Sequence, residues 1–510
     1  MLKAADDDAS ARRSVQSYID ETPVWSDGTA LLSAPMTGMQ WLIWTLAACG
    51  KFFEGMVVFM TGVALPLISQ EFGLGKTAHG VIGAASLFGI LVGAIGLGGL
   101  SDVFGRKRMF VLEMFIFVAF LCLLVVSPNY PLLVLFLFGL GVALGCDYPT
   151  AHVMISESIP SSARGRLVLG AFGFQALGAL TGTMVGYLVL KNVPDIGAWR
   201  WMYAVAIVPA LVVAVWRFWV TESAHWLLSR GRRDAAEVEM RRLLGRTPPY
   251  PTAIRLVEPP PASARARRSF ADLFAPANRR ATILASVPWF LQDLGTYGIG
   301  IFTPTILASA VGHKAPHIRN LADLVGNDEL AARGAALIDV LLIVGIVAAV
   351  LLVNRVGSIR LQTFGFIGCA AGLAVAASSS AFTGATQTAM IFAGFMLFNF
   401  MTNMGPNAQT YLLAGEVFPT AVRGMGAGFA AAFAKIGAVT TAFLFPILLA
   451  DIGREALLFI LVGASIAGAI VTWAARIETT GVNLETIGSR EPGPQSLGLS
   501  PARGLATGST

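Results

Sequence analysis

Three side chains that can bond a polar solute recur on one face of an expected helix: Trp289, Asp293 and Tyr297. Their i, i+4, i+8 spacing places them one above the other, because an α-helix takes about 3.6 residues per turn. Asp293 lies about a third of the way along an apolar segment from about 281 to 311. An ionised side chain inside a bilayer costs at least about 2.5 kcal/mol, so it normally faces a cavity or a partner and carries a function. This face therefore predicts a polar site within the membrane.

The composition is that of a polytopic membrane protein. The chain has 510 residues, of which 55% are hydrophobic and 13% charged, whereas a soluble domain carries about 25% charged residues. The net charge of +6 comes from Lys and Arg gathered in particular loops, so nucleic acid is not an expected partner. The first 38 residues are polar and show no cleavable signal peptide.

The sequence does not indicate an enzyme, a metal site or a cofactor. The four cysteines, Cys49, Cys122, Cys146 and Cys369, all fall inside apolar segments and form no C-x-x-C pair. We expect inert thiols and no disulfide framework. There is also no nucleophile elbow and no phosphate-cradling P-loop.

Twelve apolar segments are long enough to cross a hydrocarbon core as helices, which takes roughly 20 residues. They fall into two sets of six around a polar interval, at 39–69, 78–101, 108–127, 131–155, 166–190 and 199–220, then 281–311, 335–354, 361–380, 386–412, 423–449 and 455–475. The predicted fold class is an all-α membrane protein. Its expected parts are 1–38, a six-helix bundle over 39–220, a loop over 221–280, a second bundle over 281–475 and a disordered tail over 476–510.

Loop charge predicts the orientation. Basic residues follow the second, fourth, eighth and tenth helices, on the same side as both termini and the proline-rich central loop. By the positive-inside rule that side is cytoplasmic. The long loop of about 312–334 on the other side also contains Lys314, Arg319 and Arg333, which weakens the rule without reversing it. An amphipathic helix is expected over 235–244, and the rest of the central loop is expected to be an extended linker.

An internal repeat relates the two sets of helices. The pattern E-x-x-P-x-x-x-R-G occurs at Glu157 to Gly165 after the fourth helix and at Glu416 to Gly424 after the tenth. Two copies in the same orientation form a parallel repeat, which favours a substrate site between the halves at mid-membrane.

These features resemble the major facilitator superfamily. Gly98, Leu100, Asp102, Gly105, Arg106 and Lys107 match its loop signature G-x-L-x-D-R-x-G-R-K, with Val103 at the position of the first Arg. Trp199 to Met202, Thr221 to Leu228 and Glu478 to Gly481 are similar to segments of its sugar porters. The resemblance implies twelve transmembrane helices in two six-helix pseudo-repeats and proton-coupled transport by alternating access.

Within that superfamily the chain most resembles the phosphate:proton symporters. The similar segments are Gly145 to Pro149, Trp289 to Asp293 with Tyr297, Gly405 to Asn407 and Ala434 to Gly437. The resemblance implies a phosphate site made by Tyr148, Gln175, Trp289, Asp293, Tyr297 and Asn407, with Lys435 as a positive partner. It also implies proton handling by Glu54, Asp147 and Asp293. Cys146, Glu54 and the segment Thr150 to His152 depart from the family pattern and leave the substrate open.

Each of these residues also has a simpler interpretation. Asp293 could form a structural ion pair with Lys435, and Glu54 could neutralise Lys51 one turn earlier. Asp147 could serve helix packing. The aromatic residues could be core side chains with satisfied polar tips, and Gln175 and Asn407 could only bridge helices. His152 fits a packed or interfacial histidine better than a proton relay.

The loop motifs predict a cytoplasmic gate of ion pairs between the halves. Its expected members are Asp102, Gly105, Arg106, Glu157, Arg164, Glu416 and Arg423, with Gly105 allowing the tight turn. The function predicted is proton-coupled symport of inorganic phosphate in a bacterial inner membrane. A sugar or a small organic anion such as an aromatic acid is the alternative substrate, and a non-transporting sensor is the alternative of another class. No obligatory protein partner is expected.

Overall fold

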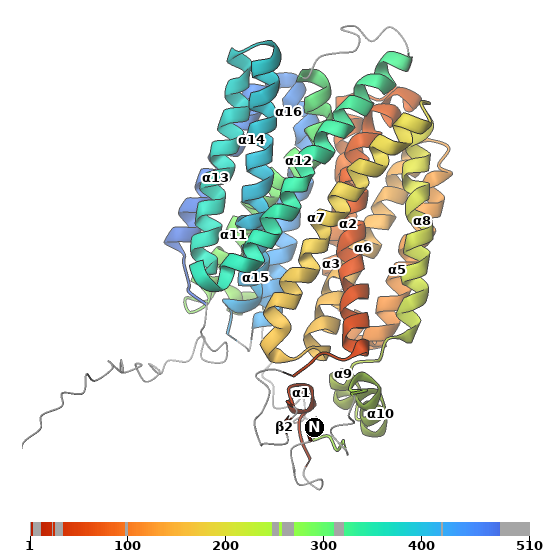
Figure 1. Ribbon diagram of the computed structural model, residues 1–510, viewed down its shortest axis with the longest axis vertical. Coiled ribbons are helices and arrows are strands. Elements are labelled where there is room, and N and C mark those ends of the chain that lie inside the picture. The colour runs from red at the N-terminus through yellow and green to blue at the C-terminus, as the bar shows by residue number, and fades with distance from the viewer. Residues whose placement is uncertain are drawn as a thin grey trace, which may run out of the picture.

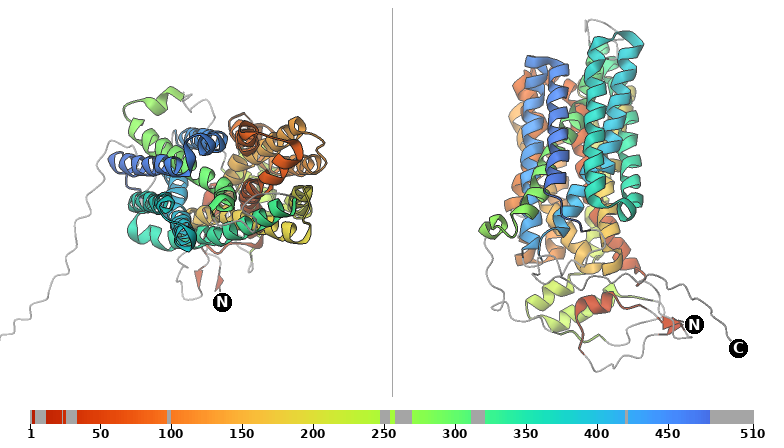
Figure 2. Two further views of the ribbon diagram at one scale, coloured as in Figure 1. Left: turned by 90° about the horizontal axis from the view of Figure 1, so that it is seen from above. Right: turned by 90° about the vertical axis from the view of Figure 1, so that its left-hand side faces the viewer.

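The computed structural model describes residues 2–3, 12–22, 24–25, 34–96, 100–246, 254–257, 270–310, 321–419 and 422–479. Long helices dominate and stand side by side in two groups (Figure 1). Seen from above, the helices of the first half and those of the second half occupy opposite sides of the molecule (Figure 2). This arrangement is what a parallel repeat of two six-helix units predicts.

The first bundle has six long helices. They are α2 (Gly38–Phe72), α3 (Lys76–Gly96), α5 (Arg106–Val125), α6 (Tyr130–Ser158), α7 (Ser161–Asn192) and α8 (Ala198–Trp216). The turn α4 (Leu100–Phe104) precedes α5, and the 3-10 turn η1 (Arg217–Trp219) follows α8.

The second bundle repeats this order with two interruptions. It contains α11 (Arg279–Ala310), α12 (Leu321–Val356), α13 (Ser358–Ser378), the turn η4 (Ser379–Ala381), α14 (Gly384–Met404), α15 (Pro406–Glu416) and α16 (Arg423–Ala474). The expected helix over 386–412 is broken at Gly405 and Pro406. The long α16 is two helices that meet at Gly453, whose φ of 80° is not helical.

Nine of the described helices are long and apolar enough to span a membrane by length and composition alone, with α16 taken as one of them. Three more spans complete the set of twelve. They are the second helix within α16, the helix α11 with its polar residues, and α14 together with α15. The predicted fold class is thus confirmed as the major facilitator fold.

The largest difference from the predicted boundaries lies before the eighth span. Residues 312–334 were expected to form a loop, but α12 already begins at Leu321. Polar residues such as Asp328 and Arg333 interrupt the apolar pattern there, yet they are compatible with a helix that extends beyond the apolar region. Residues 311–320, with Lys314 and Arg319, and the predicted tail after residue 479 lie outside the described residues.

The helices of the N-terminal segment and the central loop form a layer beneath the first bundle (Figure 1). Its helices are α1 (Val15–Ile19), α9 (Ala224–Ser229) and α10 (Arg233–Leu243), and α10 confirms the expected helix over 235–244. Arg13 pairs with Leu256 in a parallel bridge, and Arg246 donates to the carbonyl oxygen of Ile19 at 3.0 Å. We call this side of the molecule the loop end and the opposite side the far end. The short elements β1 (Leu2–Lys3), β2 (Val24–Trp25) and η3 (Phe270–Phe274) lie outside the bundles.

The two halves touch closely toward the far end. A Cβ at Gly62 of α2 would overlap the carbonyl oxygen of Ile301 in α11, so only glycine permits this approach. Lys76 at the start of α3 forms an ion pair with Asp451 in α16. The far end is therefore closed in this conformation.

Candidate functional site

Lys435 of α16 is the centre of a polar cluster between the halves. Its Nζ atom donates to the Tyr297 hydroxyl oxygen at 2.6 Å. The same atom lies 3.4 Å from Asp293 Oδ2 and 3.5 Å from Glu54 Oε1. Asp293 and Tyr297 come from α11 and Glu54 from α2, so one ammonium group joins both halves of the molecule.

Glu54 connects this centre to the rest of the first half. Lys51 lies one turn earlier on α2, with its Nζ 2.5 Å from Glu54 Oε2. Gln175 of α7 donates to Glu54 Oε1 at 3.4 Å and to the Tyr297 oxygen at 3.1 Å. The Tyr297 hydroxyl in turn donates to Glu54 Oε1 at 3.0 Å. The Tyr297 hydroxyl oxygen thus accepts hydrogen bonds from Lys435 and Gln175, and its single hydrogen is donated to Glu54.

The central cluster, defined as Lys51, Glu54, Gln175, Asp293, Tyr297 and Lys435, is occluded and balanced in charge. Asp293 is only 1% exposed and Glu54 3%. Two lysines face two carboxyl groups. Buried charges persist when they are paired and hydrogen-bonded in this way, so the cluster is neutral when both acids are ionised and has a net charge of +1 when either takes a proton.

The other predicted substrate residues lie around the cluster or outside it. Trp289 is buried one turn from Asp293, and its ring meets that of Tyr411 edge-on at 6.1 Å. Asn407 of α15 donates to Asn403 Oδ1 of α14 at 2.6 Å, across the break at Gly405. The side chain of Tyr148 lies outside the described residues.

Asp147 belongs to a second buried group in the first half. Its Oδ1 lies 2.5 Å from Arg217 Nη1, and Glu113 Oε1 lies 3.6 Å from the same nitrogen. Arg217 also donates to the carbonyl oxygen of Phe110 at 2.7 Å and stacks over that residue's ring. We call Glu113, Asp147 and Arg217 the buried triad.

The buried triad was not predicted from the sequence. Arg217 lies near the end of the apolar segment 199–220, a position where basic residues are common at a membrane interface. The structure buries Arg217 completely. Glu113 was missed although it gives the same signal as Asp293, an acid within an apolar segment. Asp339 of α12 is a further buried acid of this kind.

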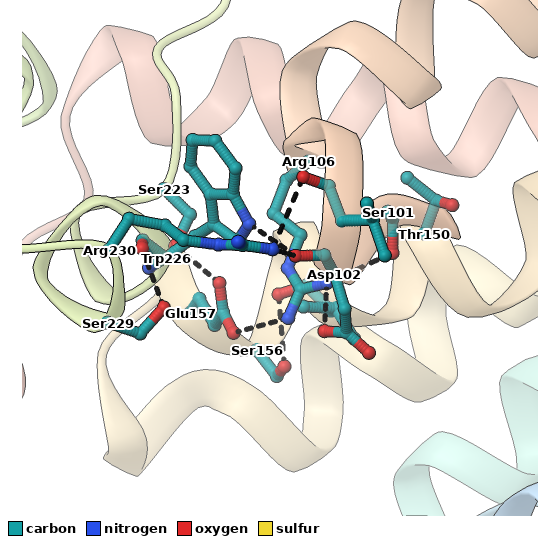
Figure 3. Close-up of polar contacts among 12 residues, drawn as sticks. Ser101, Asp102, Arg106, Thr150, Ser156, Glu157, Ser223, Trp226, Ser229 and Arg230 are labelled. Carbon is teal, nitrogen blue, oxygen red and sulfur yellow. Dashed lines mark hydrogen bonds and ion pairs between the residues drawn. The ribbon is translucent and has the colours of Figure 1, made fainter. Parts of the chain in front are cut away.

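Three first-half members of the predicted gate, Asp102, Arg106 and Glu157, lie together at the loop end (Figure 3). Arg106 lies 2.5 Å from Asp102 Oδ1 and 3.6 Å from Glu157 Oε1. Trp226 of the central loop donates to the carbonyl oxygen of Asp102 at 2.8 Å, and Ser223 donates to Glu157. The layer of the central loop therefore supplies the partners of this motif.

Gly105 is the N-cap residue that precedes α5, and its φ of 108° favours glycine. A Cβ added there would lie 2.7 Å from a carboxylate oxygen of Glu222. Burial raises the pKa of Glu222, although the backbone N–H groups of Lys107 and Ser223 lower it in part. The expected role of Gly105 in a tight turn agrees with this geometry.

The remaining gate residues are bound within their own half. Arg164 donates to Gln16 at 3.0 Å. Glu416 accepts from Thr479 at 2.7 Å, and Arg423 donates to the carbonyl oxygen of Phe418 at 3.2 Å. In this conformation each of these three residues thus contacts a neighbouring segment of its own half.

Tyr411 of α15 joins the halves just below the central cluster. Its hydroxyl lies 3.0 Å from His152 Nδ1 of α6, and its ring stacks on Phe172 of α7 with centroids 4.7 Å apart. These contacts close the path from the cluster toward the loop end. This role was not predicted from the sequence, because a tyrosine near a helix end is common at a membrane interface.

Tyr411→Phe should weaken this closure slightly, because the stacking on Phe172 remains and the hydrogen bond to His152 is lost, a net effect of about 1 kcal/mol. Tyr411→Ala should open the loop end more than Tyr411→Phe does, because it removes the stacking on Phe172 as well as the hydrogen bond to His152. The measurement is alkylation of single cysteines placed at Ala408 and Leu412, with an increase expected for Ala over Phe over the parent protein. Equal labelling of all three proteins would exclude a closing role.

The sequence matches the family model described as sugar (and other) transporter over residues 43–490. The chain belongs to this family. Family and fold are those of transporters and not of enzymes. As a member of the sugar (and other) transporter family, the chain is an integral, multi-pass membrane protein.

Its relatives carry different substrates. An inner membrane metabolite transport protein of Escherichia coli, YgcS, is 28% identical over 86% of this chain and 91% of its own length. The niacin transporter NiaP of Acinetobacter baylyi is 28% identical over 88% and 96%. A repressible high-affinity phosphate permease of Neurospora crassa is 27% identical over 77% and 75%. The substrate of this chain therefore does not follow from its similarity to these relatives.

Among solved structures, the xylose transporter XylE from E. coli in a partially occluded inward-open conformation is similar, with a TM-score of 0.70. The identity is 19%, and the match covers 88% of this chain and all of that one. This similarity establishes the fold, and the chemistry of the site must be argued from its own residues.

Proposed function

We propose that this transporter is a proton-coupled symporter of a monovalent anion, with inorganic phosphate as the first candidate. The supporting observation is the charge balance of the central cluster, in which Lys51 and Lys435 face Glu54 and Asp293. One proton on Asp293 gives the site a charge of +1, so a monoanion can enter with the proton and restore neutrality. A neutral sugar would gain little from two buried lysines.

The neutral donors near the cluster support the same proposal. An anion that leaves water must exchange its hydrogen bonds for protein donors. Gln175 and Tyr297 lie in the cluster, and Trp289 follows one turn away on α11. We infer that Asn407, Tyr148 and these donors surround the substrate once the site opens. Asp147 would act in proton transfer through the buried triad.

A small aromatic acid is the second candidate. Trp289, Tyr411 and Phe172 form a chain of ring contacts beside the cluster. Aromatic rings prefer such edge-on and stacked neighbours, so this wall can accept the ring of an organic anion while Lys435 binds its carboxylate. The relative named for niacin transport makes nicotinate the first probe of this class.

We infer that the loop end is cytoplasmic and that the protein resides in a bacterial inner membrane. The basic residues of the loops gather at this end, and one relative is named as an inner membrane protein. The ion pair of Lys76 with Asp451 closes the far end and the Tyr411 contacts close the loop-end side of the cluster, so we infer that this conformation is occluded. The two bundles would then exchange access by rocking about the central cluster.

The test is uptake into proteoliposomes under an acid-outside gradient, with labelled phosphate, nicotinate and xylose as separate probes. Phosphate should accumulate, and Asp293→Asn should remove the dependence on the gradient because residue 293 can no longer release a proton. Asp195→Asn, a change of an exposed acid, is the matched control and should behave as the parent protein.

Nicotinate uptake without phosphate uptake would select the second candidate, and xylose uptake alone would reject an anion site. If none of the probes is transported while each shifts the unfolding temperature, the sensor alternative gains support.

A further inference from the structure

Asp339 is a buried acid that the central cluster and the buried triad do not use. It lies in the middle of α12 with 3% of its surface exposed. Thr183 of α7, in the first half, lies 3.1 Å from its Oδ2 atom. Asn399 of α14, in the second half, donates to its Oδ1 atom at 3.2 Å. Asp339 therefore lies in the seam between the two halves, held by neutral groups from both.

No basic side chain forms an ion pair with Asp339 among the described residues. The helices packed against α12 are α14, α7, α11, α13 and α2. Within these helices and α12 itself the charged or titratable groups are Lys51, Glu54, Glu71, Arg164, Arg166, Tyr187, Lys191, Arg279, Arg280, Asp293, Tyr297, Asp323, Asp328, Glu329, Arg333, Arg355, Arg360 and Cys369, together with Cys49. Those of α7 lie at its ends, and α14 carries no charged residue. An ionised Asp339 would thus be an unpaired charge within the membrane, which is strongly unfavourable.

The hydrogen bonds at Asp339 distinguish its two protonation states. Thr183 Oγ1 lies within reach of three acceptors, Asp339 Oδ2 and the carbonyl oxygens of Ala179 at 3.2 Å and Leu180 at 3.1 Å. A hydroxyl has only one hydrogen. If Asp339 is ionised, Thr183 must turn that hydrogen toward it, and the carboxylate receives one weak bond on that oxygen.

If Asp339 is protonated, every group is satisfied. Its O–H donates to Thr183 Oγ1, and Thr183 donates to a carbonyl oxygen of its own helix. Asn399 uses one N–H for Asp339 Oδ1 and directs the other to the carbonyl oxygen of Ile338 at 3.4 Å. The geometry therefore favours the neutral carboxyl group in this conformation.

We propose that Asp339 is a second proton-binding site, separate from the central cluster, whose proton is held while α7 and α12 remain in contact at Thr183. The bond crosses the seam, so a motion that separates the halves at this level breaks it and admits water to the carboxyl group. Asp339 then ionises, and its reprotonation accompanies closure. Proton binding at Asp339 does not depend on the identity or presence of a substrate. The role of Asp339 in the transport cycle rests on the proposed proton coupling.

The test uses infrared difference spectroscopy of the purified full-length protein in lipid, without substrate. The parent protein at neutral pH should show the carbonyl stretch of a protonated carboxyl group that Asp339→Asn removes. Glu329→Gln, a change of a half-buried acid on the same helix, is the control and should leave this band in place. A spectrum unchanged by Asp339→Asn would overturn the proposal.

Two further measurements keep the test decisive if Asp339→Asn folds poorly. Thr183→Val should shift the band because it removes the acceptor of the carboxyl hydrogen, whereas Thr181→Val on the exposed face of the same helix should not. The unfolding temperature of the parent protein should also fall as the pH rises from about 5 to 8, since the folded state keeps a proton that the unfolded chain releases. Thr183→Val should reduce this dependence of the unfolding temperature on pH. If Thr183→Val and Thr181→Val affected the infrared band and the pH dependence equally, the assignment would be contradicted. None of these readouts depends on which substrate is carried.

Discussion

Lys435→Met is expected to abolish uptake and to lower the free energy of unfolding by about 3–5 kcal/mol, the range found when one partner of a buried ion pair is removed. The reason is that Lys435 Nζ lies 3.4 Å from Asp293 and 3.5 Å from Glu54. Without it, Lys51 alone faces two buried acids, and the cluster has a net negative charge that repels an anionic substrate. Phosphate uptake in proteoliposomes and thermal unfolding in lipid measure the two effects.

A double variant separates charge balance from transport. Lys435→Met with Asp293→Asn leaves one lysine and one acid, so most of the lost stability should return while uptake stays absent. Lys76→Met is the matched control for the unfolding measurement, because its ion pair with Asp451 is about half exposed and such pairs contribute roughly 0–1 kcal/mol. Full uptake by the Lys435→Met protein would show that the lysine is only structural.

Arg217→Leu should be the most destabilising substitution in the first bundle, also by about 3–5 kcal/mol. Arg217 is fully buried and lies 2.5 Å from Asp147 and 3.6 Å from Glu113. Its loss leaves two acids without a counter-charge and the carbonyl oxygen of Phe110 without its donor. Thermal unfolding and the yield of folded protein from membranes are the measurements.

Neutralising the acids should reverse much of this loss. Arg217→Leu combined with Asp147→Asn and Glu113→Gln removes all three charges and should recover stability toward that of the parent. Arg233→Leu, which removes a half-buried pair with Glu237 on α10, is the control and should change little. An Arg217→Leu protein as stable as this control would show that the triad is not held by its arginine.

The fold was largely predictable because the bilayer restricts a spanning chain to a few arrangements. Apolar segments placed eleven of the twelve spans near their observed positions, and the repeated loop motif gave their symmetry. The start of α12 at Leu321 was missed because Asp328 and Arg333 ended the apolar pattern but not the helix. The division at Gly405 was also missed, since hydropathy carries no information on a local break in helical hydrogen bonding.

The central cluster was predicted in part. Lys435 does contact both Asp293 and Tyr297, which follows from the high cost of leaving a charged group unpaired in the membrane. The partners of Asp147 and of the gate residues depend on which helix faces pack together, and spacing along one chain does not give that. Arg217 is the clearest example, because its burial depends on a fit between three helices and not on its own apolar neighbours.

The bridge between Arg13 and Leu256, with the contact from Arg246 to Ile19, has a consequence for biosynthesis. These two contacts can form only after about 250 residues have been made, when the first six spans are complete and the second six are not. Domains form in the order of synthesis. The N-terminal half can thus mature as a finished unit, with its layer at the loop end in place, before the translocon receives the first residue of α11.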